Sequence, residues 1–420
     1  MPAHRRIATG LRFLGRLVLL GGLAGCAPDG GSSEEPPPLT VVEEAPAPLG
    51  TPPETRTIDA YEGDLRALGA QGSSSVLGTT AGAFAVEEGG LLALDIYGDD
   101  PDLPTSTGEV RAMARRTETL VLAAETGLYL VKGNKLQRSP ASAALAELAI
   151  SELHVTGAGD TERFWIVAGG AVYLLAGGEL GEISIEGHAD EAIAISPSAA
   201  GTSVLVAYPD GVHEVDLEKG EARELPHDVG EVRAMARGGE KVVYFASDRG
   251  LFVRGEDGAY TQFTLSGSGE PVAVDTVLVD PEGPIAVTGA AVVRLPADGA
   301  PAIVAELAEA TERRRAAADD VGLVWVGGGG RVEGFLLGKP AGFEADVAPV
   351  LGEYCMNCHT DPGVNGAPPV DMNDYETTKE KASLIVQRIA AGQMPPPGAP
   401  PLPAEKYELV LRWYSSGQNP

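Results

Sequence analysis

The sequence contains little cysteine, histidine, tryptophan or positive charge. Its 420 residues include three cysteines, six histidines and three tryptophans, and 31 Lys and Arg residues stand against 60 Asp and Glu. The formal charge of −29 makes nucleic acid and anionic lipid poor partners. It suits either a basic protein partner or simple solubility in crowded surroundings, and we favour solubility. His188, His213 and His227 show no metal-ligand spacing, so we expect them on the surface.

Long apolar runs are also missing beyond the N-terminus. After residue 26 no run of 18 apolar residues occurs, so we expect no membrane-spanning helix in the mature chain. Residues 1–25 combine four arginines with a short apolar stretch from Leu17 to Leu23, which is the pattern of a secretion signal. Removing this segment would bring the formal charge of the mature chain near −33, because it holds four arginines and no acids.

The end of this signal, Leu23-Ala24-Gly25-Cys26, resembles the lipobox of bacterial lipoproteins. The resemblance implies that Cys26 is diacylated and becomes the mature N-terminus, which anchors the protein stably in a membrane of the bacterial cell envelope, facing the periplasm. Ala27 directly after the cysteine implies the outer membrane in that family. The alternative is an ordinary signal peptide in which the cysteine is incidental.

The other two cysteines lie in Cys355-Met356-Asn357-Cys358-His359. This spacing is the attachment pattern of a c-type haem, in which the two thiols bond to the porphyrin and the imidazole binds the iron. A zinc ribbon would need two further soft ligands near these cysteines, and the sequence offers none. We therefore predict one covalent haem c on Cys355 and Cys358 with His359 as an axial ligand, which leaves no structural disulfide.

The composition between the signal and the haem motif changes twice. Residues 26–56 are rich in proline and acid and poor in large apolar groups, so we expect a disordered tether. Residues 57–338 repeat: the octapeptide that begins at Gly108 recurs identically at Gly230. Glycines such as Gly127 and Gly250 open alternating strands in units of about 40 residues, the length of a four-stranded propeller blade.

These repeats predict an all-β propeller of about seven blades. Segments 164–167 and 324–327 resemble the repeats of two-component-regulator propellers. The sequence contains no Trp-Asp dipeptide, so we do not expect a propeller of the WD40 type. The segment from Thr57 to Tyr61 could complete the last blade and close the ring. A string of β-sandwiches is the alternative architecture.

Three arginines, Arg66, Arg111 and Arg233, occupy the same phase of their repeats, and His154 has a similar place in another. If they converge near the propeller axis, they could bind an anion or a carboxylate of a partner. Alternatively they lie on a solvent-exposed loop face and pair with Glu109 or Glu231, since charged groups are usually solvated.

From 342 to 420 the pattern becomes helical, with apolar spacing in 343–351, 377–391 and 404–414. A haem motif after the first helix and an aromatic residue in the last resemble class I cytochrome c, which implies a small all-α domain. Met394 lies in Gly392-Gln393-Met394-Pro395, a segment that resembles the distal methionine loop of that family. The resemblance implies that Met394 is the sixth iron ligand; Met372 and an open site are the alternatives.

Together these features predict an extracytoplasmic lipoprotein that transfers single electrons, an electron carrier rather than a catalyst. The propeller would dock a redox partner protein of the cell envelope. One alternative is a quinoprotein-like dehydrogenase whose propeller feeds electrons to the haem, although only Trp165 and Trp325 lie in the repeat region and such propellers carry recurring tryptophans. Another is a haem-based sensor of redox state or a ligand, which needs an open or displaceable iron position.

Overall fold

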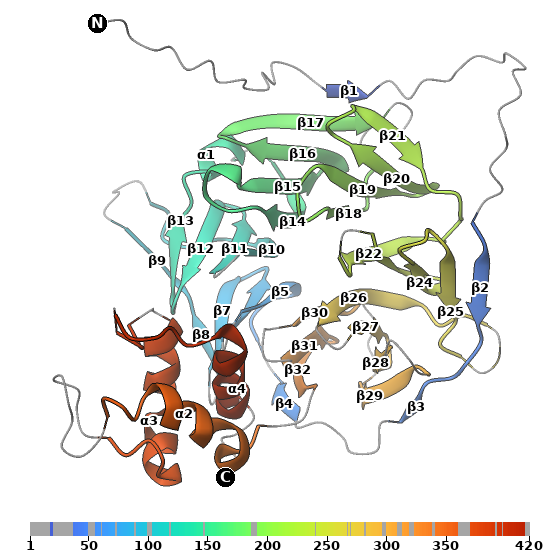
Figure 1. The fold of residues 1–420 in the computed structure, drawn as a ribbon. Coiled ribbons are helices and arrows are strands. Elements are labelled where there is room, and N and C mark those ends of the chain that lie inside the picture. Colours follow the sequence, from blue (N-terminus) through green and yellow to red (C-terminus); the bar gives the residue numbers. More distant parts are fainter. Residues whose placement is uncertain are drawn as a thin grey trace, which may run out of the picture.

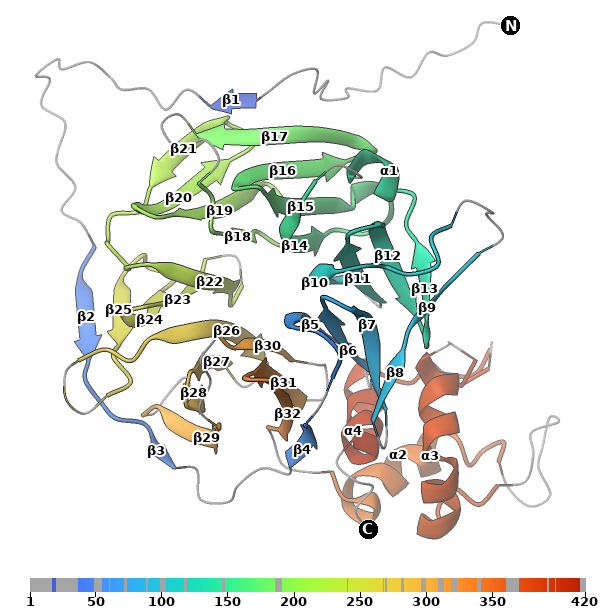
Figure 2. The ribbon, with the colours of Figure 1, turned by 180° about the vertical axis from the view of Figure 1, so that it is seen from behind.

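In the computed structural model, seven sheets surround a common axis (Figures 1 and 2). Neighbouring strands within each blade pair antiparallel in chain order, apart from the last blade, which an N-terminal strand completes. The first strands of successive blades contact one another around the centre of the ring. This arrangement is a seven-bladed β-propeller, which confirms the architecture predicted from the repeats.

The blades consist of short strands. Blades 1 to 4 are formed by β5 (Leu65–Gln71), β6 (Ser74–Thr79), β7 (Gly82–Glu87) and β8 (Gly90–Ala93); β10 (Val110–Arg116), β11 (Thr119–Ala124), β12 (Gly127–Lys132) and β13 (Lys135–Arg138); β14 (Ile150–Thr156), β15 (Arg163–Ala168), β16 (Ala171–Ala176) and β17 (Glu179–Ile185); and β18 (Ala194–Pro197), β19 (Ser203–Tyr208), β20 (Gly211–Asp216) and β21 (Glu221–Glu224). Blades 5 to 7 are formed by β22 (Val232–Arg237), β23 (Val243–Ser247), β24 (Gly250–Arg254) and β25 (Tyr260–Phe263); β26 (Val274–Asp280), β27 (Gly283–Thr288), β28 (Ala291–Arg294) and β29 (Ala302–Glu306); and β30 (Arg315–Ala318), β31 (Leu323–Gly328), β32 (Arg331–Leu336) and β4 (Thr55–Ile58).

The structure describes most of the chain. The described residues are 17–19, 37–48 and 55–415, except for gaps at 60, 72–73, 88–89, 99–102, 117–118, 146–147, 186–190, 240, 267, 269, 281–282, 296–299, 309–312, 319–322, 338–340, 360–369, 391–392 and 397. The predicted lipidation site, Cys26, and all of the predicted signal except β1 (Leu17–Leu19) lie outside this range. β1 pairs parallel with β17, and cleavage before Cys26 would remove it.

Alternating apolar residues and glycine turns form the hairpins of the blades. Gly250 opens β24 with φ of +105°, and a Cβ atom there would lie 2.3 Å from the carbonyl oxygen of Phe263. Only glycine fits such a position, because it combines an unusual backbone angle with a close backbone approach. Gly82, Gly127 and Gly211 likewise open the third strands of their blades, as the glycine-marked repeats predict.

The chain closes the ring near its N-terminus. β4 pairs antiparallel with β32, so Ile58 lies opposite Val332 and Thr55 opposite Phe335. Closure of the last blade by an N-terminal strand agrees with the prediction, although the strand begins two residues before Thr57. It joins the two ends of the propeller chain in one sheet and covers an edge that would otherwise be open.

Four further strands pair parallel with outer edges of blades, and they include β1 on blade 3. The others are β2 (Leu39–Val42) on β25, β3 (Ala47–Pro48) on β29 and β9 (Asp95–Tyr97) on β13. The described part of the segment predicted as a disordered tether therefore runs along the rims of blades 5 and 6 (Figure 1). Here the structure differs from the prediction, because the backbone obtains its hydrogen bonds from free sheet edges and needs no core of its own.

Seven clusters of buried apolar side chains fill the spaces between consecutive blades in the described chain. Six of them each join two neighbouring blades; Trp165 and Val206, for example, lie in the cluster between blades 3 and 4. The seventh joins blade 7 to blade 1 through residues such as Trp325 and Leu77, and it continues into the C-terminal helices. We call it the closure core. The helices therefore complete the apolar packing at the point where the ring closes.

The helical region follows blade 7. It comprises the π-helical turn η2 (Phe343–Val347) and helices α2 (Ala348–Tyr354), α3 (Tyr375–Ala390) and α4 (Ala404–Ser415); the propeller itself contains α1 (Ser142–Leu145) and the 3-10 turn η1 (Gly159–Thr161). These bounds agree closely with the three segments predicted from apolar spacing. Trp413 of α4 is 1% exposed, and its ring centroid lies 5.4 Å from that of Phe343. None of the helices in the described chain is both long and apolar enough to span a membrane.

Candidate functional site

The Cys-x-x-Cys-His motif forms one tight turn directly after α2. The N–H of Cys355 donates to the carbonyl of Leu351 at 2.8 Å, so the first cysteine caps the helix. The N–H groups of Cys358 and His359 both donate to the carbonyl of Cys355 at 3.1 Å. The turn therefore fixes both thiols and the imidazole within one short stretch of backbone at the end of a helix.

Burial distinguishes the residues of this turn. His359 is only 8% exposed, whereas Cys355 and Cys358 are half-buried and form no disulfide. Cys355 packs against the closure core, and this burial raises the pKa of its thiol to about 11, with a smaller contribution from the charge of Cys358. A thiol that stays protonated at neutral pH is a weak nucleophile, so the turn does not resemble a redox-active Cys-x-x-Cys pair, whose reactive cysteine has a lowered pKa.

The loop that carries Met394 is attached to the end of α3. The N–H groups of Gln393 and Met394 both donate to the carbonyl of Arg388, at 2.9 and 3.2 Å. Met394 is half-buried, and the bond to Pro395 is cis. The side chain of Arg388 is exposed and donates to the side chain of Gln393. The position of this loop is therefore fixed by backbone hydrogen bonds to a helix.

Met372, the other methionine considered as an iron ligand, belongs to the closure core. It is 8% exposed and packs in the same cluster as Leu351 and Val386. Its carbonyl accepts a hydrogen bond from the hydroxyl of Thr378, which is fully buried, at 3.0 Å. The side chain already serves as packing between helices, which favours Met394 over Met372 as a ligand.

These residues suit a covalently attached haem. Two unbridged thiols lie on one turn beside apolar side chains, a buried imidazole follows, and a thioether lies on a fixed loop, which is the donor set of a c-type haem with His and Met ligands. In the described residues no group of three or more His, Cys, Asp and Glu side chains could hold a metal ion. Residues 360–369 and 391–392, next to His359 and Met394 in the chain, lie outside the described range.

A second cluster of functional groups lies at the inner strands of the propeller, where five blades of the described chain carry a β-bulge near the start of the first strand. The residues at these bulges are Arg66, Arg111, Ser151, Arg233 and Asp275. A bulge bends the strand and redirects a side chain, so the shared phase of the three arginines has a structural cause. His154 was predicted at a similar place in its repeat, but the residue at the bulge of blade 3 is Ser151.

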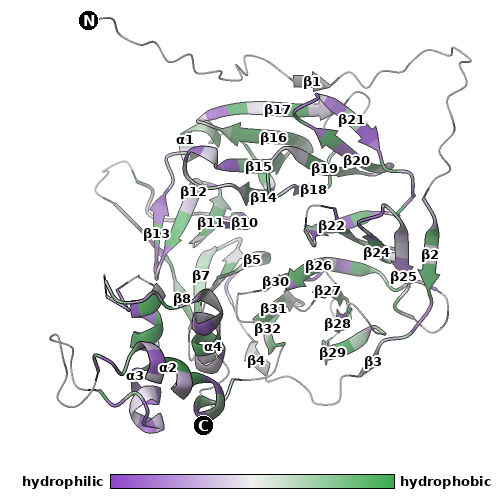
Figure 3. Ribbon diagram, in the orientation of Figure 1, coloured by the Kyte–Doolittle hydropathy of each residue, from purple (hydrophilic) through white to green (hydrophobic). Residues whose placement is uncertain are grey.

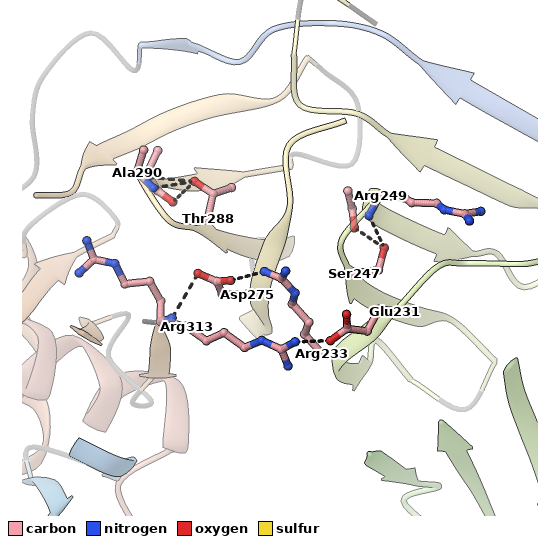
Figure 4. Close-up of polar contacts among 11 residues, drawn as sticks. Glu231, Arg233, Ser247, Arg249, Asp275, Thr288, Ala290 and Arg313 are labelled. Carbon is pink, nitrogen blue, oxygen red and sulfur yellow. Dashed lines mark hydrogen bonds and ion pairs between the residues drawn. The ribbon is translucent and has the colours of Figure 1, made fainter. Parts of the chain in front are cut away.

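The bulge arginines are paired with acids rather than converging on an open anion site. Arg66 lies 3.1 Å from one carboxylate oxygen of Glu109, and Arg111 lies 3.0 Å from the other. Arg233 lies 2.6 Å from Asp275, whose second oxygen accepts the backbone N–H of Arg314 at 3.2 Å (Figure 4). The contacts of Arg66 and Arg233 link neighbouring blades. The expected pairing with Glu109 is confirmed, whereas Arg233 contacts Asp275 of the next blade and Glu231 contacts Arg313.

A third polar contact joins blade 3 to blade 4. Glu152 accepts the backbone N–H of Ile195 at 3.0 Å through one oxygen, and its other oxygen lies 2.8 Å from the ring nitrogen of His154. The residues at and beside the bulges thus connect blades across the inner ring. The repeat in the sequence indicated where these charges would lie, but not which acid each would contact.

The isolated histidines are less exposed than predicted. His213 is 9% exposed and its ring contacts that of Tyr208 edge-on, so its assignment to the surface is wrong. His227 is half-buried and lies 2.7 Å from the carbonyl of Pro37, while its ring packs 4.5 Å from that of Tyr260. His188 lies outside the described residues. His227 therefore holds the N-terminal segment in place, a role that no local pattern in the sequence indicates.

Comparisons with known proteins support the propeller. No protein-family model matches the chain, and no curated protein matches it. Among solved structures, the propeller domain of Doa1 matches with a TM-score of 0.52 and 12% identity over 68% of this chain and 96% of that chain.

Two bacterial regulators give similar values. The extracellular domain of the putative hybrid two component system BT4673 from B. thetaiotaomicron has a TM-score of 0.52 and 12% identity over 68% of this chain. That of BT3049 has a TM-score of 0.52 and 12% identity over 69%. The matches cover 40% and 42% of those two chains. At such identities the likeness shows the fold alone: a seven-bladed propeller similar to those of regulator extracellular domains.

Proposed function

We propose that the protein is a lipoprotein of the bacterial cell envelope that transfers single electrons through one covalently bound haem c. The turn from Cys355 to His359 carries this proposal, because it presents two unbridged thiols and a buried imidazole at the end of one helix. A haem held by thioether bonds and ligated by an imidazole and a thioether sulfur supplies a one-electron couple without an open iron position.

The residues around the motif have separate tasks in this proposal. Cys355 and Cys358 would form the thioether bonds, and burial of the Cys355 thiol in apolar surroundings would exclude water from the attachment. His359, held by the backbone of the turn, would supply one iron ligand through its imidazole, and Met394 would supply another through its thioether sulfur. The hydrogen bonds from the Met394 loop to Arg388 limit its movement, which lowers the entropy lost on ligation.

The propeller would serve as the platform that docks a redox partner. The closure core supports this, since buried residues of blades 7 and 1 and of the helices form one apolar cluster, so the helical region is packed on the ring. Figure 3 shows apolar residues where the helices meet blade 1. A partner that recognises the propeller would therefore meet the helices in a defined orientation, and the negative charge of the chain suits a basic partner.

The test is the absorption spectrum of the purified mature protein, oxidised and reduced, with and without carbon monoxide. We expect a low-spin c-type spectrum with a weak charge-transfer band from methionine ligation, unchanged by carbon monoxide. Met394→Ala should remove the band and admit carbon monoxide, whereas the control Met372→Leu should retain it. A high-spin spectrum of the parent, or ready carbon monoxide binding, would overturn the electron carrier and favour a sensor or an enzyme.

A further inference from the structure

The N-terminal segment is fastened to the rim of blade 5 much closer to Cys26 than its composition suggests. The carbonyl of Pro37 lies 2.7 Å from the His227 ring, and the carbonyl of Pro38 accepts the N–H of Tyr260 at 3.0 Å. β2 then pairs with β25 from Leu39 to Val42. The chain is thus held to the propeller at residues 37–42.

This attachment limits how far the propeller can move from a lipid on Cys26. Only eleven residue steps separate Cys26 from Pro37. A fully extended chain spans at most about 3.6 Å per residue, so the attachment point lies within about 40 Å of the lipidated cysteine. A tether that remained free to residue 56 would reach nearly three times as far. The rim of blade 5 is therefore the part of the ring that the anchor holds nearest the bilayer.

The same rim carries exposed apolar side chains. Leu39 and Val41, which share one face of β2, are 43% and 47% exposed. Val272 is 38% exposed, and its N–H donates to the carbonyl of Thr264 at 2.7 Å, while Thr264 N–H donates to Val42. Three of the six large apolar side chains that the described residues expose thus lie at this one edge. Elsewhere on the described surface such residues are scattered singly, which needs no special explanation.

We propose that the rim of blade 5, formed by β2 and the end of β25, lies against the bilayer surface, so that the helical region points away from the membrane. The inference rests on the proposed lipid anchor at Cys26. Figures 1 and 2 place β2 and the helices on opposite sides of the ring. Glu43 and Glu44, directly after β2, are exposed, so the surface suits zwitterionic lipid rather than anionic lipid.

This orientation determines the class of redox partner. The helical region, with its Cys-x-x-Cys-His turn, would be presented to the aqueous space beyond the propeller. The protein would then exchange electrons with a water-soluble protein rather than with a protein embedded in the same bilayer. The propeller would act as a spacer between the lipid and that partner.

The test uses the mature, lipidated protein in vesicles of phosphatidylcholine with brominated acyl chains, because bromine quenches tryptophan emission at short range. Val41→Trp places a reporter on β2. Tyr97→Trp is the matched control, since Tyr97 is 38% exposed on an outer strand of blade 2. The parent protein, with its own tryptophans at 165, 325 and 413, provides the background.

The ratio of emission in brominated and ordinary lipid is the readout, and the ratio cancels any quenching common to both lipids. We expect this ratio to fall for Val41→Trp and to equal that of the parent for Tyr97→Trp. Equal ratios for the two variants, with the parent floating with the vesicles, would overturn the orientation alone. If the parent did not float with the vesicles, both the proposed lipid anchor at Cys26 and the proposed orientation would be wrong. The haem proposal is independent of this result and is tested by the absorption spectrum.

Discussion

Replacing Asp275 by alanine should destabilise the propeller far more than replacing Glu231 by alanine. Both acids pair with arginines at the inner ring and both link different blades (Figure 4). The Asp275 and Arg233 side chains are 7% and 19% exposed, whereas those of Glu231 and Arg313 are 50% and 52% exposed. The two pairs therefore differ chiefly in burial, and each variant serves as the control for the other.

The expected magnitudes follow from that difference. Removing one partner of a buried ion pair typically costs about 3–5 kcal/mol, because the other charge is left in a site of low polarity. Asp275 also accepts the N–H of Arg314, which would lose that acceptor. Arg233 retains some contact with water, so we expect the lower end, about 3 kcal/mol. Exposed pairs contribute about 0–1 kcal/mol, so Glu231→Ala should be almost neutral.

The assay is thermal unfolding followed by far-ultraviolet circular dichroism. For a chain of this size about 1 kcal/mol shifts the midpoint by about 2–4 °C, so Asp275→Ala should lower it by about 6–12 °C and Glu231→Ala by at most about 4 °C. Equal shifts for the two variants would refute the argument that burial decides the strength of these contacts. If Asp275→Ala barely lowered the midpoint of thermal unfolding, the apolar clusters between blades, rather than this ion pair, would hold the inner ring together.

Three further predictions concern the helices, the blades and the motif. Trp413→Ala should cost about 3–5 kcal/mol of helical stability, measured by urea unfolding, whereas truncating exposed Leu384 should change little. Burial alone would raise the pKa of Glu214, but the hydrogen bond from Arg223 and the charges of nearby arginines hold this pKa below its ordinary 4.5. The ionised Glu214 therefore stabilises the fold above pH 4.5, and this contribution is lost as the pH falls further. The free energy of unfolding of Glu214→Gln should fall less on acidification than that of the parent. Cys355→Ala should leave the helical region largely unfolded while the propeller keeps its circular dichroism.

Much of the propeller could be predicted because its units repeat. The identical octapeptides at Gly108 and Gly230 set the period, and both lie at the first strand of a blade, so one strand pattern indicated the others. Ring closure was predictable because a lone strand-like segment, Thr57 onward, preceded the first repeat. The helix bounds were also predictable, since apolar spacing reports the buried face of a helix directly.

Contacts between distant segments were not predictable. The docking of Pro37 on His227 depends on a free sheet edge and on backbone carbonyls, neither of which leaves a trace in local composition. The bulge at Arg111 shifts the register of its strand, yet the alternation of that strand looks regular in the sequence. Pairing of Arg233 with Asp275 joins residues 42 positions apart in different blades. The haem and the ligand role of Met394 stay predictions.

The most direct test of the central proposal is the intact mass and the in-gel haem stain of the protein purified from a host that exports it and matures c-type cytochromes. We predict one haem bound through residues 355–359, surviving denaturation, on a chain that begins at a lipid-modified Cys26. The Cys355→Ser, Cys358→Ser double variant should lose it. An exported, mature protein that carries no covalent haem would contradict the proposed electron carrier.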